Sequence, residues 1–157
     1  MISHQMTAKT ADGMVRSELI WPNSPPPMSV SDRSWVYAVR RGRKERSTER
    51  SGKWLVFVSR EYADSLWDRI ASATTEGKLG PSAKCGTAKF NSHSKSPKAT
   101  VICVYTGDFE DKEDVMRVRE ELKALGITRR IPYKLDETTI AGRYSGQGDG
   151  NVTVLSA

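Results

Sequence analysis

The residues whose types could do chemistry form a basic and aromatic set in the second half of the chain. Lysines and arginines at strand ends can hold phosphate groups, and tyrosine rings can stack on a nucleic-acid base. The acids Asp136 and Glu137 accompany this set. The candidate ligand-binding residues are Lys84, Lys89, Arg129, Tyr133, Lys134, Arg143 and Tyr144. Their chemistry predicts a site for a phosphorylated ligand, with RNA or a nucleotide favoured.

Other kinds of catalytic and metal site lack their residues in this sequence. The two histidines, His4 and His93, have no partner at metal-ligand spacing. The sequence contains no Walker lysine, dinucleotide fingerprint or nucleophile elbow. Cys85 has no histidine close to it in the sequence. We therefore expect neither a metal nor a cofactor.

The four tryptophans occupy two kinds of position. Trp35, Trp54 and Trp67 each sit in an apolar periodic run, which predicts core positions rather than base-stacking ones. Trp21 precedes a proline-rich stretch, PNSPPP, which is extended and incompatible with a helix. Residues 1–30 therefore read as a proline-rich arm, which either docks a partner or lies along the domain with Trp21 packed on it.

The length and charge of the chain limit the classes of protein to which it can belong. With 157 residues it suits one domain, and 25 basic against 19 acidic residues give a net charge of +6. Such a charge favours anionic partners, including RNA, nucleotides and phosphoproteins, although a role in solubility alone is an equal alternative. The sequence has two cysteines, no secretory pattern and no apolar run approaching the ~20 residues that span a bilayer. We expect an intracellular protein, cytoplasmic or nuclear, without a membrane partner.

The stretch from residue 100 to 139 predicts a strand, a helix and a second strand. Residues 101–105 (VICVY) form an apolar, β-branched run that is typical of a buried strand. Asp111 can cap a helix whose apolar residues, Val115, Val118, Leu122 and Leu125, share one face. Gly126 is the residue type that ends helices in the left-handed conformation. Residues 127–133 return as a strand, with Pro132 at an edge or at the strand's end.

The first half of the chain supplies the remaining elements. Residues 34–40 and 54–58 predict two strands, which we expect to form a hairpin around the basic stretch of residues 40–53. That stretch is either a phosphate-binding loop or a solvated loop. A helix follows over residues 60–74, with Tyr62, Leu66 and Ile70 on its apolar face, and Ser82 to Thr87 predict a third strand.

These elements predict one α+β domain over residues 31–145, followed by a glycine-rich tail over residues 146–157, in which Val152 to Leu155 are either a short last strand or part of the tail. The order of elements suits an antiparallel sheet with helices on one face. The opposite face would then be open to a ligand. A disulfide between Cys85 and Cys103, on neighbouring predicted strands, stays open as an alternative to two reduced thiols.

Several segments resemble the basophilic-leukaemia-expressed protein family, over roughly residues 34–145. They are WVYAVR, GKWLVFV, AKCGTAK, VICVYTGDFEDKEDVMRVREELKALG and PYKLDETTIAGRYS. The resemblance implies the fold of the mRNA-cap-binding translation initiation factors, a curved antiparallel sheet backed by helices. Those factors hold methylguanine between two tryptophans with a glutamate on the base edge. This sequence shows no such Trp–Glu pair, so nucleotide or RNA binding is expected rather than cap recognition as such.

The same resemblance implies an alternative, because some members of the family are labelled phosphothreonine lyases. That chemistry needs a base, an acid and a phosphate clamp. Lys84 or Lys89 would be the base, His93 the acid, and Arg129 or Arg143 the clamp. A protein-interaction scaffold that uses the proline-rich arm is the third hypothesis. Whether the protein is an enzyme is left open by the sequence.

Overall fold

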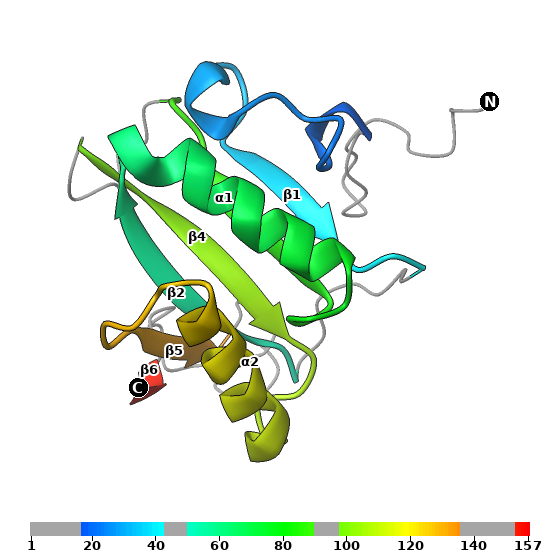
Figure 1. Ribbon diagram of the computed structural model, residues 1–157, viewed down its shortest axis with the longest axis vertical. Coiled ribbons are helices and arrows are strands. Elements are labelled where there is room, and N and C mark those ends of the chain that lie inside the picture. Colours follow the sequence, from blue (N-terminus) through cyan, green and yellow to red (C-terminus); the bar gives the residue numbers. More distant parts are fainter. Residues whose placement is uncertain (1–16, 43–49, 90–97, 136–152) are drawn as a thin grey trace, which may run out of the picture.

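The computed structural model describes residues 17–42, 50–89, 98–135 and 153–157. Within these ranges the chain forms a six-stranded antiparallel sheet in the order β1-β3-β4-β2-β5-β6 (Figure 1). The strands are β1 (Trp35–Val39), β2 (Gly52–Ser59), β3 (Ser82–Gly86), β4 (Ala99–Thr106), β5 (Pro132–Leu135) and β6 (Thr153–Ser156). The predicted α+β class, with a curved antiparallel sheet backed by helices, is confirmed.

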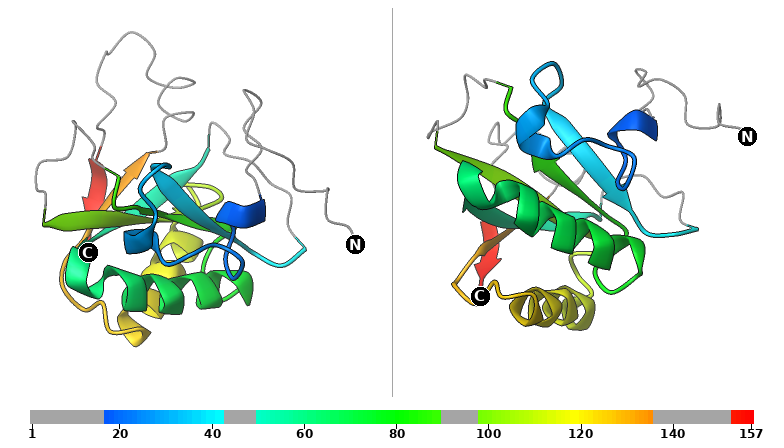
Figure 2. Two further views of the ribbon diagram at one scale, coloured as in Figure 1. Left: turned by 90° about the horizontal axis from the view of Figure 1, so that it is seen from above. Right: turned by 45° about the horizontal axis from the view of Figure 1, so that its top comes forward.

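Two helices, α1 (Arg60–Thr75) and α2 (Lys112–Ala124), lie on the same side of this sheet (Figure 2). The predicted start of α2 is confirmed, because the Asp111 side chain accepts a hydrogen bond of 3.2 Å from the Asp114 main-chain N–H. Its predicted end is also confirmed, since Gly126 has a φ of 100° that other residue types rarely adopt. Local signals at both ends therefore delimit this helix.

Helix α1 departs from its predicted apolar face at one position. Leu66 and Ile70 are buried, but Tyr62, one turn earlier, is 63% exposed. Ser59 occupies the position before the helix, yet its side chain makes no capping hydrogen bond. The first turn of α1 therefore projects past the core, and its apolar face begins at Ala63 and Leu66.

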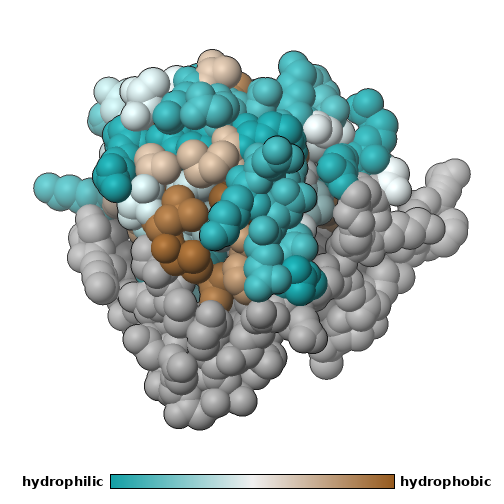
Figure 3. Space-filling view, turned by 90° about the horizontal axis from the view of Figure 1, so that it is seen from below, coloured by the Kyte–Doolittle hydropathy of each residue, from teal (hydrophilic) through white to brown (hydrophobic). Residues whose placement is uncertain are grey.

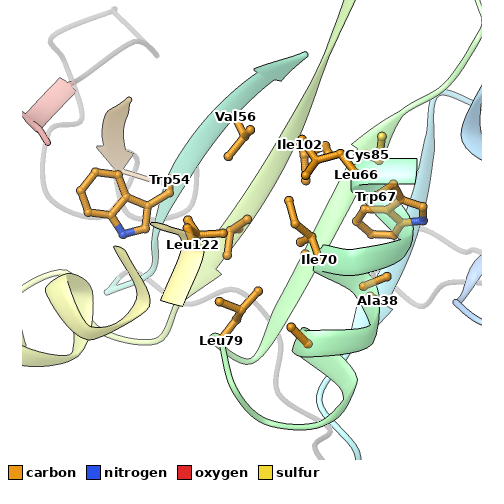
Figure 4. Close-up of a cluster of buried hydrophobic side chains, with 14 of the residues drawn as sticks. Ala38, Trp54, Val56, Leu66, Trp67, Ile70, Leu79, Cys85, Ile102 and Leu122 are labelled. Atoms are coloured by element: carbon orange, nitrogen blue, oxygen red, sulfur yellow. The ribbon is translucent and has the colours of Figure 1, made fainter. Parts of the chain in front are cut away.

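The main core fills the space between the two helices and the sheet (Figure 4). Trp54 and Ile70 are fully buried in it, and Trp67 is 2% exposed. The Trp54 indole N–H donates to the Val115 carbonyl of α2 at 3.0 Å, so it ties β2 to that helix. The predicted core positions of Trp54 and Trp67 are confirmed.

The predicted hairpin between the first two strands is wrong. Strand β1 pairs with β3, whereas β2 lies between β4 and β5. Both β2 and β4 are eight-residue strands with nearly continuous apolar runs, which is the pattern of strands covered on both faces. These two strands therefore take the middle of the sheet, and β1 is left at its edge.

The return strand after α2 is shorter than predicted. Residues 127–131 form a loop, and β5 begins at Pro132. Ile127 and Ile131 are each only 2% exposed, so their apolar character reflects burial rather than strand pairing. Pro132 lies at the first position of a strand that is paired on both sides, by β2 and β6.

The packed domain extends beyond the predicted boundaries at 31 and 145. Leu19 and Val30 belong to the core, and short 3-10 helices, η1 (Ser17–Leu19) and η2 (Pro27–Ser29), precede β1. The Trp21 indole N–H donates to the Asp68 carboxylate of α1 at 2.9 Å. At the other end of the chain, β6 is a paired strand rather than a tail.

Hydrophilic side chains cover most of the described surface on the face shown in Figure 3, and one hydrophobic patch interrupts them. Charged residues of α2 such as Glu113 and Lys123 are exposed, in keeping with a helix that is apolar on one side only. Neither helix in the described part of the chain is long and apolar enough to cross a membrane.

Candidate ligand-binding face

The six described strands contain three charged residues, all of them lysines: Lys53, Lys84 and Lys134. Side chains of a strand alternate between the two faces of a sheet, and residues directly opposite each other share a face. The register pairs Lys84 with Cys103, Cys103 with Leu55, and Lys53 with Lys134. All three lysines therefore lie on the face away from the helices.

That face also carries an apolar cluster of its own, separate from the main core. Leu55, Cys103 and Tyr105 are 8%, 3% and 9% exposed, and Trp35 and Val101 pack against them. The strands thus present apolar residues on both faces, with lysines added only on this one. A ligand on this face would meet an apolar floor and cationic side chains together.

Two of the lysines lie over aromatic rings of this cluster. Lys84 Nζ is 4.0 Å from the centroid of the Trp35 ring, and Lys53 Nζ is 5.7 Å from that of Tyr105. Both distances lie within the ~6 Å at which a cation is attracted to a ring face. We call the five residues Trp35, Lys53, Lys84, Tyr105 and Lys134 the lysine–aromatic face.

The prediction that Trp35 is a core residue, like Trp54 and Trp67, is wrong. Trp35 is half-buried, on the face away from the helices. Strand β1 is apolar at every position, so its alternation could not show which side faces the helices. Tyr105 was also absent from the predicted site, and Lys53 was included only as the last residue of the basic stretch 40–53. The sequence does indicate that Lys53 belongs to this face. It lies two residues before Leu55, and it is the one charged residue of β2.

Tyr133 is buried, contrary to its predicted role as a stacking residue. Its ring is 0% exposed and lies edge-on to Trp54, with centroids 5.0 Å apart. Its hydroxyl bonds to the Thr106 hydroxyl at 2.5 Å. Burial raises the pKa of Tyr133 to about 12. No face of this ring is available to a base, because strand alternation turns Tyr133 toward the helices and Lys134 away from them.

The other predicted site residues are placed elsewhere or are not described. Arg129 is exposed in the loop before β5, where its guanidinium donates to the Phe57 carbonyl. Lys89 is exposed just after β3, and its main-chain N–H donates to the Thr87 hydroxyl at 3.3 Å. Arg143, Tyr144, His93, Asp136 and Glu137 lie outside the described residues. Of the seven predicted residues, the structure places Lys84 and Lys134 on one face.

Arg50 has a structural role within the basic stretch of residues 40–53. Arg50 bonds to the Asp108 carboxylate at 2.9 Å and to the Glu110 carboxylate at 2.8 Å. These carboxylates raise the pKa of Arg50, the hydrogen bond to Asp108 contributing most. The phosphate-binding role of this stretch remains a prediction, since residues 43–49 lie outside the described ranges.

The two cysteines cannot pair in this structure. Cys85 belongs to the main core and Cys103 to the cluster on the opposite face, so their side chains point away from each other. Both are buried, and no disulfide joins them. In the described part of the chain no group of three potential metal ligands occurs either.

Comparison with known proteins agrees with this architecture. The structure is similar to that of Ascaris suum eIF4E-3 with the m2,2,7G cap, at a TM-score of 0.52 and 20% identity over 78% of this chain and 68% of that chain. It is also similar to eIF4E-3 of the same organism with the m7G cap, at a TM-score of 0.50 and 20% identity over 78% of this chain and 67% of that one. At this identity the likeness shows a shared fold.

The sequence itself shows the family. A sequence model described as basophilic leukemia-expressed protein Bles03 matches residues 42–140, which is more than half of the 157 residues. The resemblance found in the sequence segments is thereby confirmed, and the chain belongs to the Bles03 family.

Proposed function

We propose that this protein is a binding module for a phosphorylated ligand, RNA or a nucleotide, and that the lysine–aromatic face is its site. One observation carries the proposal: the only charged residues in the six described strands are three lysines, and all three lie on the same face. The face covered by the helices excludes charges, so the informative feature is their sign: a face that met only solvent would carry acids as well as lysines, and the described strands carry no acid. A one-sided cationic sheet instead suits an anionic ligand lying across it.

The aromatic rings supply the second part of the chemistry. Lys84 lies over the Trp35 ring, and Lys53 near the Tyr105 ring. A base that stacks on Trp35 would displace the Lys84 ammonium from the ring face, and the displaced ammonium would then hold a phosphate, since stacking and cationic side chains act together in sheets that bind single strands. The shared fold with cap-bound eIF4E-3 structures supports the proposal, since those proteins bind a nucleotide cap. Lys89, Arg143 and Tyr144 stay predicted contributors to this site.

The test is a titration of the purified protein with short single-stranded RNA, a nucleoside triphosphate, an m7G cap analogue and a phosphothreonine peptide. Tryptophan fluorescence reports binding, and Trp35→Phe shows whether Trp35 is the responding residue. Lys84→Gln and Lys53→Gln should each weaken RNA binding about tenfold, as expected for one charged contact. Each should also reduce the slope of log K against log salt by about 0.7.

Lys78→Gln is the matched control, because Lys78 is exposed, pairs with Glu76 at 3.3 Å and lies between α1 and β3, away from the lysine–aromatic face. It makes the same change of net charge. An equal loss of affinity in Lys78→Gln would show that only net charge matters and would refute the site. Binding of the phosphothreonine peptide alone would assign the face to a phosphoprotein instead.

A further inference from the structure

A second candidate site lies at a border of the sheet, away from Lys84 and Trp35. A cavity of about 370 Å³ opens between the end of β2, residues 62–69 of α1 and the loop after α2. Figure 1 shows this loop, which joins α2 to β5, running beside β2. Strand β5 pairs with β2 only at residues 52–54, so among the described strands none covers that side of the rest of β2.

Two exposed aromatic side chains form part of the cavity wall. Phe57 is 53% exposed and Tyr62 is 63% exposed, and both line the same cavity. Single exposed hydrophobic residues are ordinary on protein surfaces, but here the two most exposed large hydrophobic side chains of the described residues lie together. A concave site with two exposed rings indicates a surface that binds an apolar group.

Two arginines line the same cavity and give it a positive charge. Arg69 donates to the Leu125 carbonyl at 2.5 Å, and Arg129 donates to the Phe57 carbonyl. Each guanidinium has five N–H donors, so one such bond fixes its position and leaves donors that can meet a ligand. No acidic residue lines the cavity, and neither arginine has an ion pair within the described residues.

We propose that this cavity binds an acidic peptide segment of a partner protein. Carboxylates of the peptide would pair with Arg69 and Arg129, because a planar guanidinium matches a carboxylate with two parallel hydrogen bonds. One hydrophobic side chain of the peptide would lie between Phe57 and Tyr62. The Ser59 hydroxyl also lines the cavity and makes no capping bond with α1, so it can serve a polar atom of the peptide.

The shape of the site favours a peptide over a nucleic acid. A volume of about 370 Å³ is at the lower end for ligand pockets and admits about one large side chain. A single-stranded nucleic acid needs cations repeated along its backbone, as in a charged groove. This cavity has only two arginines among its lining residues, so two carboxylates on either side of one apolar residue match it better.

The experiment measures fluorescence anisotropy of a labelled short peptide with glutamates on both sides of a phenylalanine. Arg69→Gln and Arg129→Gln should each weaken its binding about tenfold. Arg33→Gln should leave binding unchanged, because Arg33 lies next to Asp32 and does not line the cavity. Peptides with glutamine in place of glutamate, or serine in place of phenylalanine, should bind at least about tenfold more weakly. Lys84→Gln should have no effect, which separates this site from the lysine–aromatic face.

Thermal unfolding checks that each variant is folded. Arg69→Lys and Arg129→Lys keep the charge but lose the paired hydrogen bonds, and they should weaken binding by a smaller factor even where a glutamine variant does not fold. The proposal is overturned if the peptide does not bind the folded wild-type protein, or if both arginine changes leave its Kd unchanged. Displacement of the peptide by a short RNA, whose own binding falls in the same arginine variants, would assign the cavity to nucleic acid instead.

Discussion

Replacing Arg119 with methionine should destabilise the protein more than any other single change to a charged residue of α2. Arg119 is 0% exposed, and its guanidinium donates to three main-chain carbonyls. They belong to Ala157 at 2.9 Å, Ile127 at 2.9 Å and Arg129 at 2.6 Å. The guanidinium also lies 5.8 Å from the centroid of the Trp54 ring. One side chain thus joins α2 to the loop before β5 and to the residue after β6.

The expected loss of stability follows from the three carbonyls that the substitution leaves without their donor. Burial lowers the pKa of Arg119, which nevertheless stays charged at neutral pH because arginine starts far above it. Each hydrogen bond from a charged group contributes about 1.5–3 kcal/mol to stability. The cost of burying the charge offsets part of the total from the three bonds. Methionine fills a similar volume but leaves three carbonyls without this donor. We expect the free energy of unfolding to fall by about 3–5 kcal/mol.

Urea unfolding followed by tryptophan fluorescence measures this change, with Lys123→Met as the matched control. Lys123 is on the same helix, exposed, and pairs only with Glu120 at 3.1 Å in the described structure, so its loss should be below about 1 kcal/mol. Deleting residues 153–157 removes the Ala157 acceptor, and Arg119→Met should then cost less than in the full chain. A loss for Arg119→Met no larger than that of the control would show that the three bonds do not outweigh the desolvation of the charge.

Three further changes test the packing. Gly80→Ala should destabilise the protein by about 2–3 kcal/mol, because its Cβ would lie 1.8 Å from the Tyr105 carbonyl oxygen, whereas Gly107→Ala, with nothing within 4 Å, should be neutral in the same urea titration. The buried Tyr133 has its pKa raised from 10.0 to about 12, so the unfolded state loses the phenol proton first and stability falls as the pH rises through this range. Between pH 9 and 11 the free energy of unfolding of Tyr133→Phe should therefore fall by about 1 kcal/mol less than that of the wild type. An equal fall in both proteins would contradict the buried position. Burial also raises the pKa of the Cys85 thiol, so a thiol reagent should modify Cys85 only as fast as the protein unfolds, and rapid labelling of the native protein would contradict its place in the core.

The sequence predicted the elements well because their signals are local. Asp111 and Gly126 mark the two ends of α2, and the apolar runs of β2 and β4 mark buried strands. Strand pairing could not be predicted in the same way. Whether β1 lies beside β2 or β3 depends on which strands take the middle of the sheet, and that choice involves all of the strands together.

The site was predicted in part, for a related reason. Lys84 and Lys134 stand out as charges in apolar strands, which a sequence shows directly. The face to which a residue points depends on the register of the sheet. Tyr133 was therefore predicted to stack on a base although it is buried, and Trp35 was predicted to lie in the core although it lies on the open face. Arg119 gives one hint in the sequence, its position four residues after Val115 on the apolar face of α2. From the sequence alone, a charged residue at this position is predicted to be exposed to solvent. Only the structure shows the carbonyls that surround it.

The residue types on the lysine–aromatic face determine what it could distinguish in a ligand. Lysine and tryptophan side chains donate hydrogen bonds and accept none, and the six described strands contain no acidic residue. Such side chains can hold phosphates and stack on rings, but an exocyclic amino group of a base needs an acceptor, and of the five residues of this face only Tyr105 has one, its hydroxyl. RNAs of different sequence should therefore bind with affinities within a few-fold of one another, while all weaken steeply with salt. Strong selection of one base, measured by competition between homopolymers, would mean that an acceptor from outside these five residues completes the site.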